Sequence, residues 1–224
     1  MGKCIFITGT DTDVGKTVIT GCIASSLLKK GKNVAVYKPV QCGNLLKGKI
    51  KSPDLFLVKN LSGISDNCIF NDYSFKFASS PHLAAELENK KVDINIIKKH
   101  FDEISKNFDY VLIEGSGGLM VPLIRDYTVL DLIRDLSVPV LVVARAGLGT
   151  INHTILTVNA LKSRKIKVIG IILNYFKGST IEEDNKKIIN QLSGVKIIGA
   201  APFSGNLRKL ADNFERYVEV NKIL

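Results

Sequence analysis

The chain alternates short, continuous apolar runs with longer stretches of helical periodicity, and this alternation limits the folds open to it. Val138–Ala144 and Val168–Leu173 have the length of buried strands, whereas Asp93–Asn107 and Thr150–Arg164 repeat apolar residues at helical spacing. Strands that are apolar on both faces and alternate with helices predict a mostly parallel sheet with helices on both faces. The predicted class is α/β, and 224 residues suit a single domain over 1–224.

The same patterns predict where the elements lie. Strands are expected over Lys3–Thr8, Asn33–Lys38, Asp109–Glu114, Val138–Ala144, Val168–Asn174 and Val195–Ala200. Helices are expected over Thr17–Lys30, Asp93–Asn107, Thr128–Leu136, Thr150–Arg164 and Ile181–Leu192, with a short one opening at Pro53. Asn206–Ile223 is expected to be largely helical, Gln41–Ser52 to be a loop and Phe70–Pro81 to be irregular. Ligands of such sheets bind at the carboxyl ends of the strands, so the informative residues are those that follow strands.

The strongest local signal is the segment Gly9–Thr17, which follows a strand and opens a helix. This is the context of a phosphate loop, in which glycines let backbone N–H groups and a helix N-terminus face phosphate oxygens. Lys16 can reach the outer phosphates, and the Thr17 hydroxyl can bind Mg²⁺. The usual pattern has a glycine six places before this lysine, where this chain has Thr10 and Gly9 lies one place further out. The segment predicts a phosphate-loop NTPase type of fold.

Other polar residues end neighbouring strands. Lys38 can meet a negatively charged reacting group, although alone it would be an ordinary surface lysine. Neither its stem nor that of Lys16 is expected to be needed for a core, so removing either should leave the fold intact. Glu114 can join Thr17 and Asp54 as hard oxygen ligands of Mg²⁺. The alternative for Asp54 is an acid that stabilises a helix start. Asn174 can read a purine edge or cap a turn.

Composition limits which kinds of partner the protein can bind and in which cellular compartment it is expected. The formal charge is +10, but the lysines are scattered, so no nucleic-acid partner is expected. Apolar runs are too short to span a membrane or to form a signal-peptide core. The four cysteines are widely spaced without a CxxC pair, which favours a reducing compartment over a zinc site or a disulfide framework. A cytoplasmic protein is expected.

Together these segments resemble the dethiobiotin synthetase family. The resemblance runs nearly the whole chain and rests on Thr8–Thr17, Tyr37–Val40, Asp54, Ser80–His82, Glu114–Gly118, Pro122-Leu123, Gly149–His153 and Asn174. It implies an enzyme that takes 7,8-diaminononanoate, CO₂ and ATP with Mg²⁺. A substrate amine captures CO₂ as a carbamate, the carbamate attacks the γ-phosphate, and the second amine closes the ring, giving dethiobiotin, ADP and phosphate.

The resemblance also implies roles for individual residues. Lys16 and Lys38 are the implied catalytic residues, and Thr17, Asp54 and Glu114 the implied Mg²⁺ ligands. The implied nucleotide site comprises Asp13, Val14, Gly15, Lys16, Thr17, Val18, Asp54, Glu114, Gly115, Ser116, Gly117, Asn174, Tyr175, Pro202, Phe203 and Ser204. The implied substrate site comprises Thr12, Cys42, Gly149, Thr150, Ile151 and Asn152, the last four binding the distant carboxylate at a helix N-terminus within a homodimer.

Cys42 departs from the family, which usually has serine or threonine there. A thiol near Lys16 and Lys38 is expected to have a lowered pKa and to react readily with alkylating agents. The alternative is that Cys42 only fills space behind the loop, which predicts slow alkylation.

Three alternatives remain open at this point. A partition-type ATPase shares the superfamily, but its loop usually carries an extra lysine near the start, and Thr8–Asp11 has none. A cobalamin-type synthetase would carry a glutaminase domain, for which 224 residues leave no room. A non-enzymatic nucleotide-binding scaffold would not need two lysines and the Mg²⁺ acids.

Overall fold

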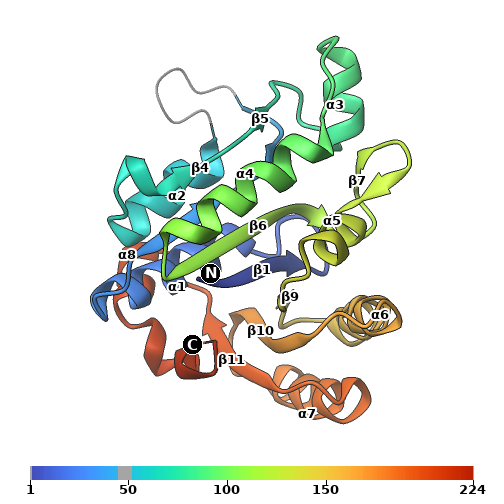
Figure 1. Cartoon of the computed structure of the whole chain (residues 1–224). Helices are drawn as coiled ribbons and strands as arrows, with labels where there is room; N and C mark the ends of the chain where they lie inside the picture. The colour runs from blue at the N-terminus through green and yellow to red at the C-terminus, as the bar shows by residue number, and fades with distance from the viewer. Residues whose placement is uncertain (1, 45–51, 224) are drawn as a thin grey trace.

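The computed structural model describes residues 2–44 and 52–223. A central parallel sheet forms its frame (Figure 1). Its seven strands lie in the order β11-β10-β9-β1-β6-β2-β4. They are β1 (Lys3–Gly9), β2 (Val34–Tyr37), β4 (Ile69–Phe70), β6 (Tyr110–Gly118), β9 (Val140–Arg145), β10 (Val168–Phe176) and β11 (Ile197–Pro202). Two small sheets pair β3 (Val40–Gln41) with β5 (Tyr73–Ser74) and β7 (Pro122–Ile124) with β8 (Tyr127–Thr128).

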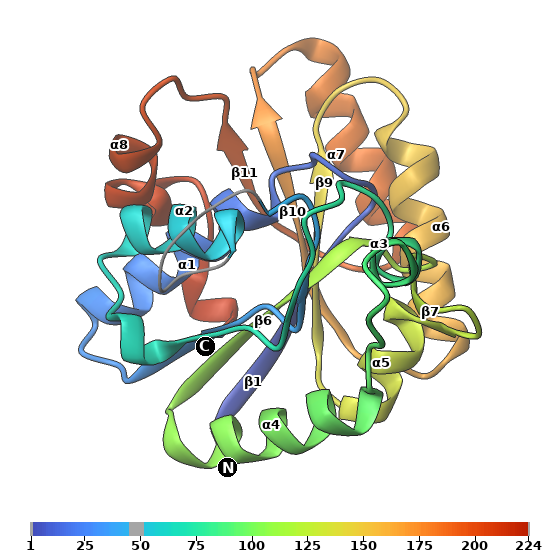
Figure 2. The same cartoon turned by 90° about the horizontal axis from the view of Figure 1, so that it is seen from above.

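Helices cover both faces of this sheet (Figure 2). In the described ranges they are α1 (Lys16–Lys29), α2 (Pro53–Ser62), α3 (Pro81–Leu87), α4 (Ile94–Asn107), α5 (Val129–Leu136), α6 (Thr150–Ser163), α7 (Thr180–Ser193) and α8 (Leu207–Asp212), with short 3₁₀ turns at Asp66–Cys68, Phe214–Arg216 and Val220–Lys222. One apolar core lies beneath α1, α2 and α8, and the other beneath α4, α5, α6 and α7. The α/β class with helices on both faces is confirmed.

β1 lies at the centre because its residues are apolar on both faces. Phe6 belongs to the core under α4 and α5, whereas Ile5 and Ile7 belong to the core under α1 and α2. The strand pairs in parallel with β6 on one side, where Phe6 faces Ile113, and with β9 on the other, where Phe6 faces Val140. This central position carries the end of β1, and the loop that follows it, to the middle of the ligand-binding edge.

Several predicted boundaries differ from those observed. β6 runs past Glu114 to Gly118, so the glycine-rich turn is itself part of the strand. The segment predicted as irregular contains β5, and it ends where α3 begins, a helix that the apolar pattern does not indicate. Part of the predicted loop over Gln41–Ser52, namely 45–51, lies outside the described residues. No helix in the described part of the chain is both long enough and apolar enough to cross a membrane.

The segment Asn206–Ile223, expected to be largely helical, contains α8 and two short 3₁₀ turns rather than one continuous helix. α8 ends at Asp212, and Val218 then forms an antiparallel bridge with Gly199 of β11. The N–H of Ala200 donates to the carbonyl of Tyr217 at 3.1 Å. These bonds satisfy backbone groups on the outer edge of β11 and bury Val218, which a continued helix would not do.

Candidate active site

The phosphate loop joins β1 to α1 and turns through two left-handed residues. Asp13 has φ 57° and Gly15 has φ 90°. A Cβ on Gly15 would lie 2.0 Å from Nδ2 of Asn174, so both backbone conformation and space require glycine there. Gly15 has no side chain to cap α1, which leaves the first N–H groups of the helix available to an anion.

Gly9 accounts for the unusual spacing of the loop. A Cβ at this position would lie 2.8 Å from the carbonyl oxygen of Asp11 and 3.0 Å from Nζ of Lys16. The close approach therefore occurs at Gly9, one residue before the position that the usual pattern assigns to glycine. Asn174, at the carboxyl end of β10, donates from Nδ2 to the carbonyl of Val14 at 3.0 Å and so braces the loop from behind.

Lys16 begins α1 and turns back over the loop. Its ammonium donates to the carbonyl oxygen of Asp11 at 2.9 Å, and the residue is buried. Burial lowers the pKa of Lys16 to about 8; the nearby charge of Lys38 acts in the same direction, and Glu114, Asp54 and Asp11 oppose it.

Lys38 lies directly after β2 and connects three elements at the floor of the site. Its Nζ donates to Oε1 of Glu114 at 2.8 Å and also to Asp54, in the first turn of α2. The Lys38 side chain is 5% exposed and that of Glu114 is 0% exposed. Burial disfavours the charge on Lys38, but the carboxylates of Glu114 and Asp54 more than offset it, so its pKa is raised. Lys38 is therefore a buried, charged ammonium.

Glu114 also contacts the phosphate loop. Its Oε1 accepts a hydrogen bond from the Thr17 hydroxyl at 2.8 Å. The other oxygen, Oε2, is buried and has no hydrogen-bond partner among residues 2–44 and 52–223. A buried carboxylate oxygen without a partner is costly, and a hard cation is one group that would satisfy it. With Thr17 and Asp54 nearby, the donor set fits Mg²⁺, which prefers oxygen ligands.

These residues line one cavity of about 880 Å³. Twelve of the residues with an implied site role line it: Thr12, Asp13, Gly15, Lys16, Thr17, Lys38, Cys42, Asp54, Glu114, Ser116, Gly117 and Tyr175. Ser80 and Pro81, which also contribute to the resemblance, line it as well. The volume is that of a small-molecule site, and cationic, acidic and hydroxyl groups converge on it.

Other residues from the sequence lie outside the lining of this cavity. Gly149 is the exposed N-cap of α6, with φ 86°, and the segment that follows it to Asn152 starts that helix elsewhere on the ligand edge. Pro202 lines a separate hollow beside β11. Phe203 is 66% exposed, with its ring centroid 6.1 Å from that of Tyr175. The residues that line the cavity do not include Val14, Val18, Gly115 and Asn174.

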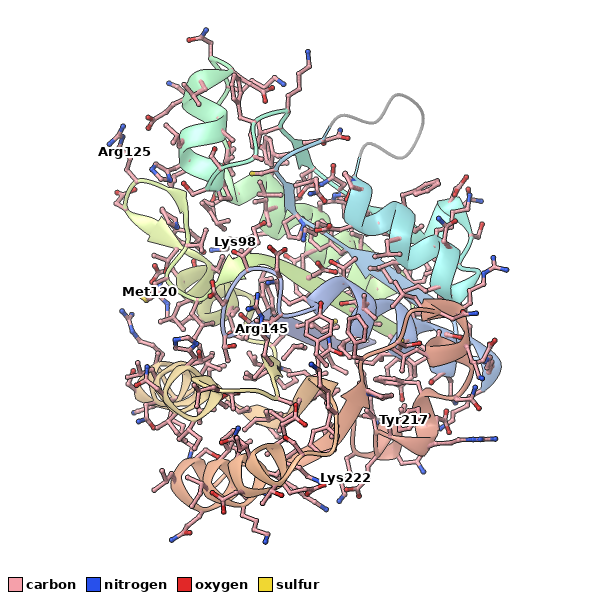
Figure 3. The ribbon with its side chains drawn as sticks, turned by 180° about the vertical axis from the view of Figure 1, so that it is seen from behind. Lys98, Met120, Arg125, Arg145, Tyr217 and Lys222 are labelled. Carbon is pink, nitrogen blue, oxygen red and sulfur yellow. The ribbon has the colours of Figure 1, made fainter. Side chains whose placement is uncertain are left out.

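Sequence reasoning assigned no role to two residues at or beside the site, Gln41 and Arg145, although both follow predicted strands. Gln41 lines the cavity, accepts a hydrogen bond from the Ser52 hydroxyl at 2.6 Å and donates to the carbonyl of Cys42 at 2.7 Å. Arg145, at the end of β9, points toward the phosphate loop (Figure 3), with Nη2 3.5 Å from the carbonyl oxygens of Thr12 and Asp13. The strand-end position of Arg145 was the available signal, whereas the contacts of Gln41 depend on the tertiary fold.

The expectation of a lowered pKa for Cys42 is wrong. Burial raises the pKa of the Cys42 thiol to about 11; Lys38 lowers it by less, and the acids Glu88 and Asp54 raise it further. Desolvation of a thiolate outweighs the attraction of a lysine that is already paired with two carboxylates. All four cysteines, each within the described ranges, are free thiols.

A glycine-rich loop between the central strand and a helix, with a lysine at the helix start and an acid from the neighbouring strand, defines a phosphate-loop nucleotide-binding protein. The family model described as an AAA domain matches residues 3–210. The ATP-dependent dethiobiotin synthetase of Brachyspira hyodysenteriae is 40% identical, covering 98% of this chain and 100% of the relative. That of Clostridium acetobutylicum is 39% identical, over 92% and 88%. The chain belongs to the dethiobiotin synthetase family, a family of ligases that form carbon–nitrogen bonds.

Solved structures share the fold at low sequence identity. The MinC:MinD cell division protein complex of Aquifex aeolicus matches with a TM-score of 0.64 and 19% identity, over 95% of this chain and 86% of that one. A ParA family ATPase from Chlorobium tepidum matches with a TM-score of 0.60 and 16% identity, over 91% and 85%. These likenesses establish the fold alone. They include a ParA family ATPase and a cell division protein, so the choice of the synthetase family rests on the sequence relatives.

Proposed function

We propose that this chain, acting as one catalytic unit over 1–224 in the cytoplasm, converts 7,8-diaminononanoate, CO₂ and ATP to dethiobiotin, ADP and phosphate in biotin biosynthesis. One amine of the substrate forms a bond to the carbon of CO₂ and loses a proton, giving a carbamate. A carbamate oxygen then attacks the γ-phosphorus, and ADP leaves. The second amine attacks the carbon of the resulting carbamic-phosphoric anhydride, and phosphate leaves as the ring closes.

The observation that carries this proposal is the presence of two buried lysines in one cavity with the phosphate loop. The reaction brings an anionic carbamate to an anionic phosphate, and their repulsion must be offset. Lys16 comes from the loop and Lys38 from the neighbouring part of the sheet, so each can neutralise one partner. Fixed charges in a water-poor site stabilise charge that develops in the transition state more than flexible ones would. No covalent nucleophile is needed, because positioning supplies much of the rate.

Mg²⁺ would be held by the Thr17 hydroxyl and the carboxylates of Glu114 and Asp54. When bound, it would neutralise phosphate charge. Glu114 supports this role through its unpartnered buried oxygen. Asp54 is 31% exposed and reaches the cavity from the first turn of α2. Its position also suits an acid at a helix start, so the two interpretations of Asp54 are compatible.

Thr12 and Cys42 are proposed to contact the diamine end of the substrate. Both line the cavity, Thr12 from the phosphate loop and Cys42 from the segment after β3. The distant carboxylate is proposed to bind the N–H groups at the start of α6, over Gly149–Asn152, from the partner in a homodimer. The separation of this segment from the cavity lining supports an arrangement across two subunits, since an extended substrate has two ends to bind.

The adenine is proposed to lie near Tyr175 and the turn over Pro202–Ser204. Tyr175 lines the cavity, and its ring centroid lies 6.1 Å from that of the exposed Phe203. Asn174 is proposed to act chiefly through the loop, since its Nδ2 is already bonded to Val14.

The test supplies purified protein with diaminononanoate, MgATP and bicarbonate and follows release of phosphate. We expect phosphate release to depend on the diamine, and we expect one mole of phosphate for each mole of dethiobiotin formed. Phosphate release at the same rate without the diamine would favour the ATPase alternative. Omission of bicarbonate from a degassed reaction is the matched control, because it removes the co-substrate and leaves the nucleotide site untouched.

A further inference from the structure

A network of hydrogen-bonded side chains, formed by Tyr37, Asp72 and the partly exposed His100, lies behind Lys38 on the face of the sheet opposite to the active-site acids. Tyr37 precedes Lys38 and is fully buried in the core under α4. Its hydroxyl donates to Asp72 and also lies 3.2 Å from the carbonyl oxygen of Ile97. Asp72 is also bonded to Nδ1 of His100, in α4. The Asp72 side chain is 5% exposed and that of His100 is 32% exposed.

Successive side chains of β2 point to opposite faces of the sheet, and this alternation places the network and the active site on either side of the strand. Tyr37 packs in the core under α4, whereas Val36 packs in the core under α2. Lys38 follows and bonds to Asp54 of α2. The end of β2 is thus held from both faces, by Asp72 through Tyr37 on one and by Asp54 through Lys38 on the other.

The segment around Asp72 also binds the backbone of Lys38 directly. The N–H of Lys38 donates to the carbonyl of Phe70 at 2.9 Å, and Nδ2 of Asn71 donates to the carbonyl of Lys38 at 2.7 Å. The N–H of Tyr73 donates to the carbonyl of Pro39 at 3.0 Å. β4 itself has only two residues, and so short an edge strand pairs weakly. The side-chain bonds of Asn71 and Asp72 therefore supply much of the anchoring.

Burying the Asp72 carboxylate is costly, and nothing in the proposed reaction uses it directly. Burial raises the pKa of Asp72, and the bonds from Tyr37 and His100 lower it by less. An apolar residue of similar size would avoid this cost, so the network needs another role; in some proteins buried ionic groups serve to fix one conformation.

We propose that Asp72 and His100 are positioning residues for Lys38: through Tyr37 they fix the end of β2, so that the ammonium of Lys38 keeps its alignment in the active site. The proposal rests on the proposed function of Lys38. Loss of the network would leave the nucleotide site intact, and it would weaken the alignment of the Lys38 ammonium with the reacting groups. A small displacement at such a contact lowers turnover strongly, whereas substrate binding changes little.

The test begins with Asp72→Asn, which keeps the shape and removes the charge. We expect kcat to fall by about tenfold and KM for ATP to change by less than about twofold. The matched control is Asp135→Asn, because Tyr127 donates to Asp135 at 2.9 Å and Lys98 of α4 pairs with it at 3.2 Å, away from Lys38. Its kcat should stay within about twofold of the parent. A similar fall in kcat for both variants would overturn the proposal.

A double-mutant cycle gives the decisive measurement. In a Lys38→Met background, Asp72→Asn should no longer lower the residual kcat, because there is no ammonium left to align. An equal proportional loss in both backgrounds would show a general structural role and overturn the proposal. Full turnover in Lys38→Met alone would instead overturn the role of Lys38. If near-UV circular dichroism shows that the Asp72→Asn variant is not folded, His100→Gln replaces it in the same cycle, because His100 is partly exposed. The same result is expected.

Discussion

At the scale of single residues, Lys38 combines burial with two ion pairs, and this combination determines what its loss costs. Lys38→Ala should lower turnover by at least about a hundredfold, the loss expected when a transition-state contact disappears. It should also lower the free energy of unfolding by about 3 kcal/mol, because Glu114 remains buried without its cation. The sequence alone predicts an intact fold with no such cost.

Glu114→Gln in the Lys38→Ala background separates the two effects. The amide removes the uncompensated charge, so urea unfolding should show most of the lost stability restored while turnover stays low. Stability that does not recover would mean that Lys38 contributes by packing rather than by charge.

Glu114→Gln in the parent protein should raise the Mg²⁺ concentration needed for half-maximal turnover, with a smaller effect on KM for the diamine. The amide keeps the shape but loses the negative charge that a hard cation prefers. Titration of Mg²⁺ at fixed ATP measures this midpoint. An unchanged midpoint would assign Glu114 to holding Lys38 and Thr17 alone.

Cys42 should react slowly with iodoacetamide at pH 8, because its pKa is raised to about 11 and only the thiolate is nucleophilic. Its rate should rise about tenfold per pH unit between pH 8 and pH 10, since the thiolate fraction grows in that proportion below the pKa. Mass spectrometry of the Cys42 peptide gives the rate. A rate that is already maximal at pH 8 would contradict the burial of this thiol, and protection by MgATP would support its place in the site.

At the scale of elements, the start of α2 couples two walls of the cavity. Ser52 is the N-cap, accepts from the N–H of Leu55 at 3.2 Å and donates to Gln41 at 2.6 Å. Ser52→Ala should lower the free energy of unfolding by about 1 kcal/mol through the lost cap, and by more because Gln41 loses a buried partner. Asp54 lies two residues on, so the Mg²⁺ midpoint should rise as well.

Ser179→Ala is a suitable control for that experiment. Ser179 caps α7 in the same way, accepting from the N–H of Glu182 at 3.3 Å, and it lies outside the cavity lining. It should lower the free energy of unfolding by about 1 kcal/mol through the lost cap, without shifting the Mg²⁺ midpoint. A shift of the midpoint in both variants would argue against a specific role for the start of α2.

Elements were predictable where the pattern is local. The apolar spacing of Ile97, Phe101 and Ile104 predicts α4, which the structure confirms with Asp93 as its N-cap. The last segment was not predictable, because the alternative to continuing α8 is a bridge from Val218 to Gly199, and no local pattern marks a partner in another element. The short α3, which begins at Pro81, likewise gives little periodic signal over seven residues.

At the scale of the whole molecule, strand order turns separate motifs into one site. The sequence places Lys16, Lys38 and Glu114 after three strands, and the sheet brings those strand ends together as β1, β2 and β6. The bond from Lys38 to Glu114 and the bond from Ser52 to Gln41 could not be predicted, because they depend on side-chain directions that only the packed structure fixes. The types of reactive side chain at the sheet edge were therefore predictable, but the hydrogen bonds and ion pairs between them were not.

The homodimer proposed above is tested on the intact protein. Sedimentation should give twice the chain mass of 24.6 kDa at working concentration. Leu148 is 96% exposed beside the start of α6, and Leu148→Asp should weaken association because it places a charge on a surface proposed to be covered. A monomer with full activity would exclude a substrate site shared between subunits.

The central position of β1 has a consequence for how the molecule is made. β1 leaves the ribosome before the two strands with which it pairs, β6 and β9, and the last residue of β9 is Arg145. At typical translation speeds, on the order of ten seconds pass before both neighbours have emerged. Until then the apolar flanks of β1 have no native partners, and the phosphate loop has no fixed base. Nucleotide affinity should therefore arise late and abruptly on nascent chains, once β9 is clear of the exit tunnel.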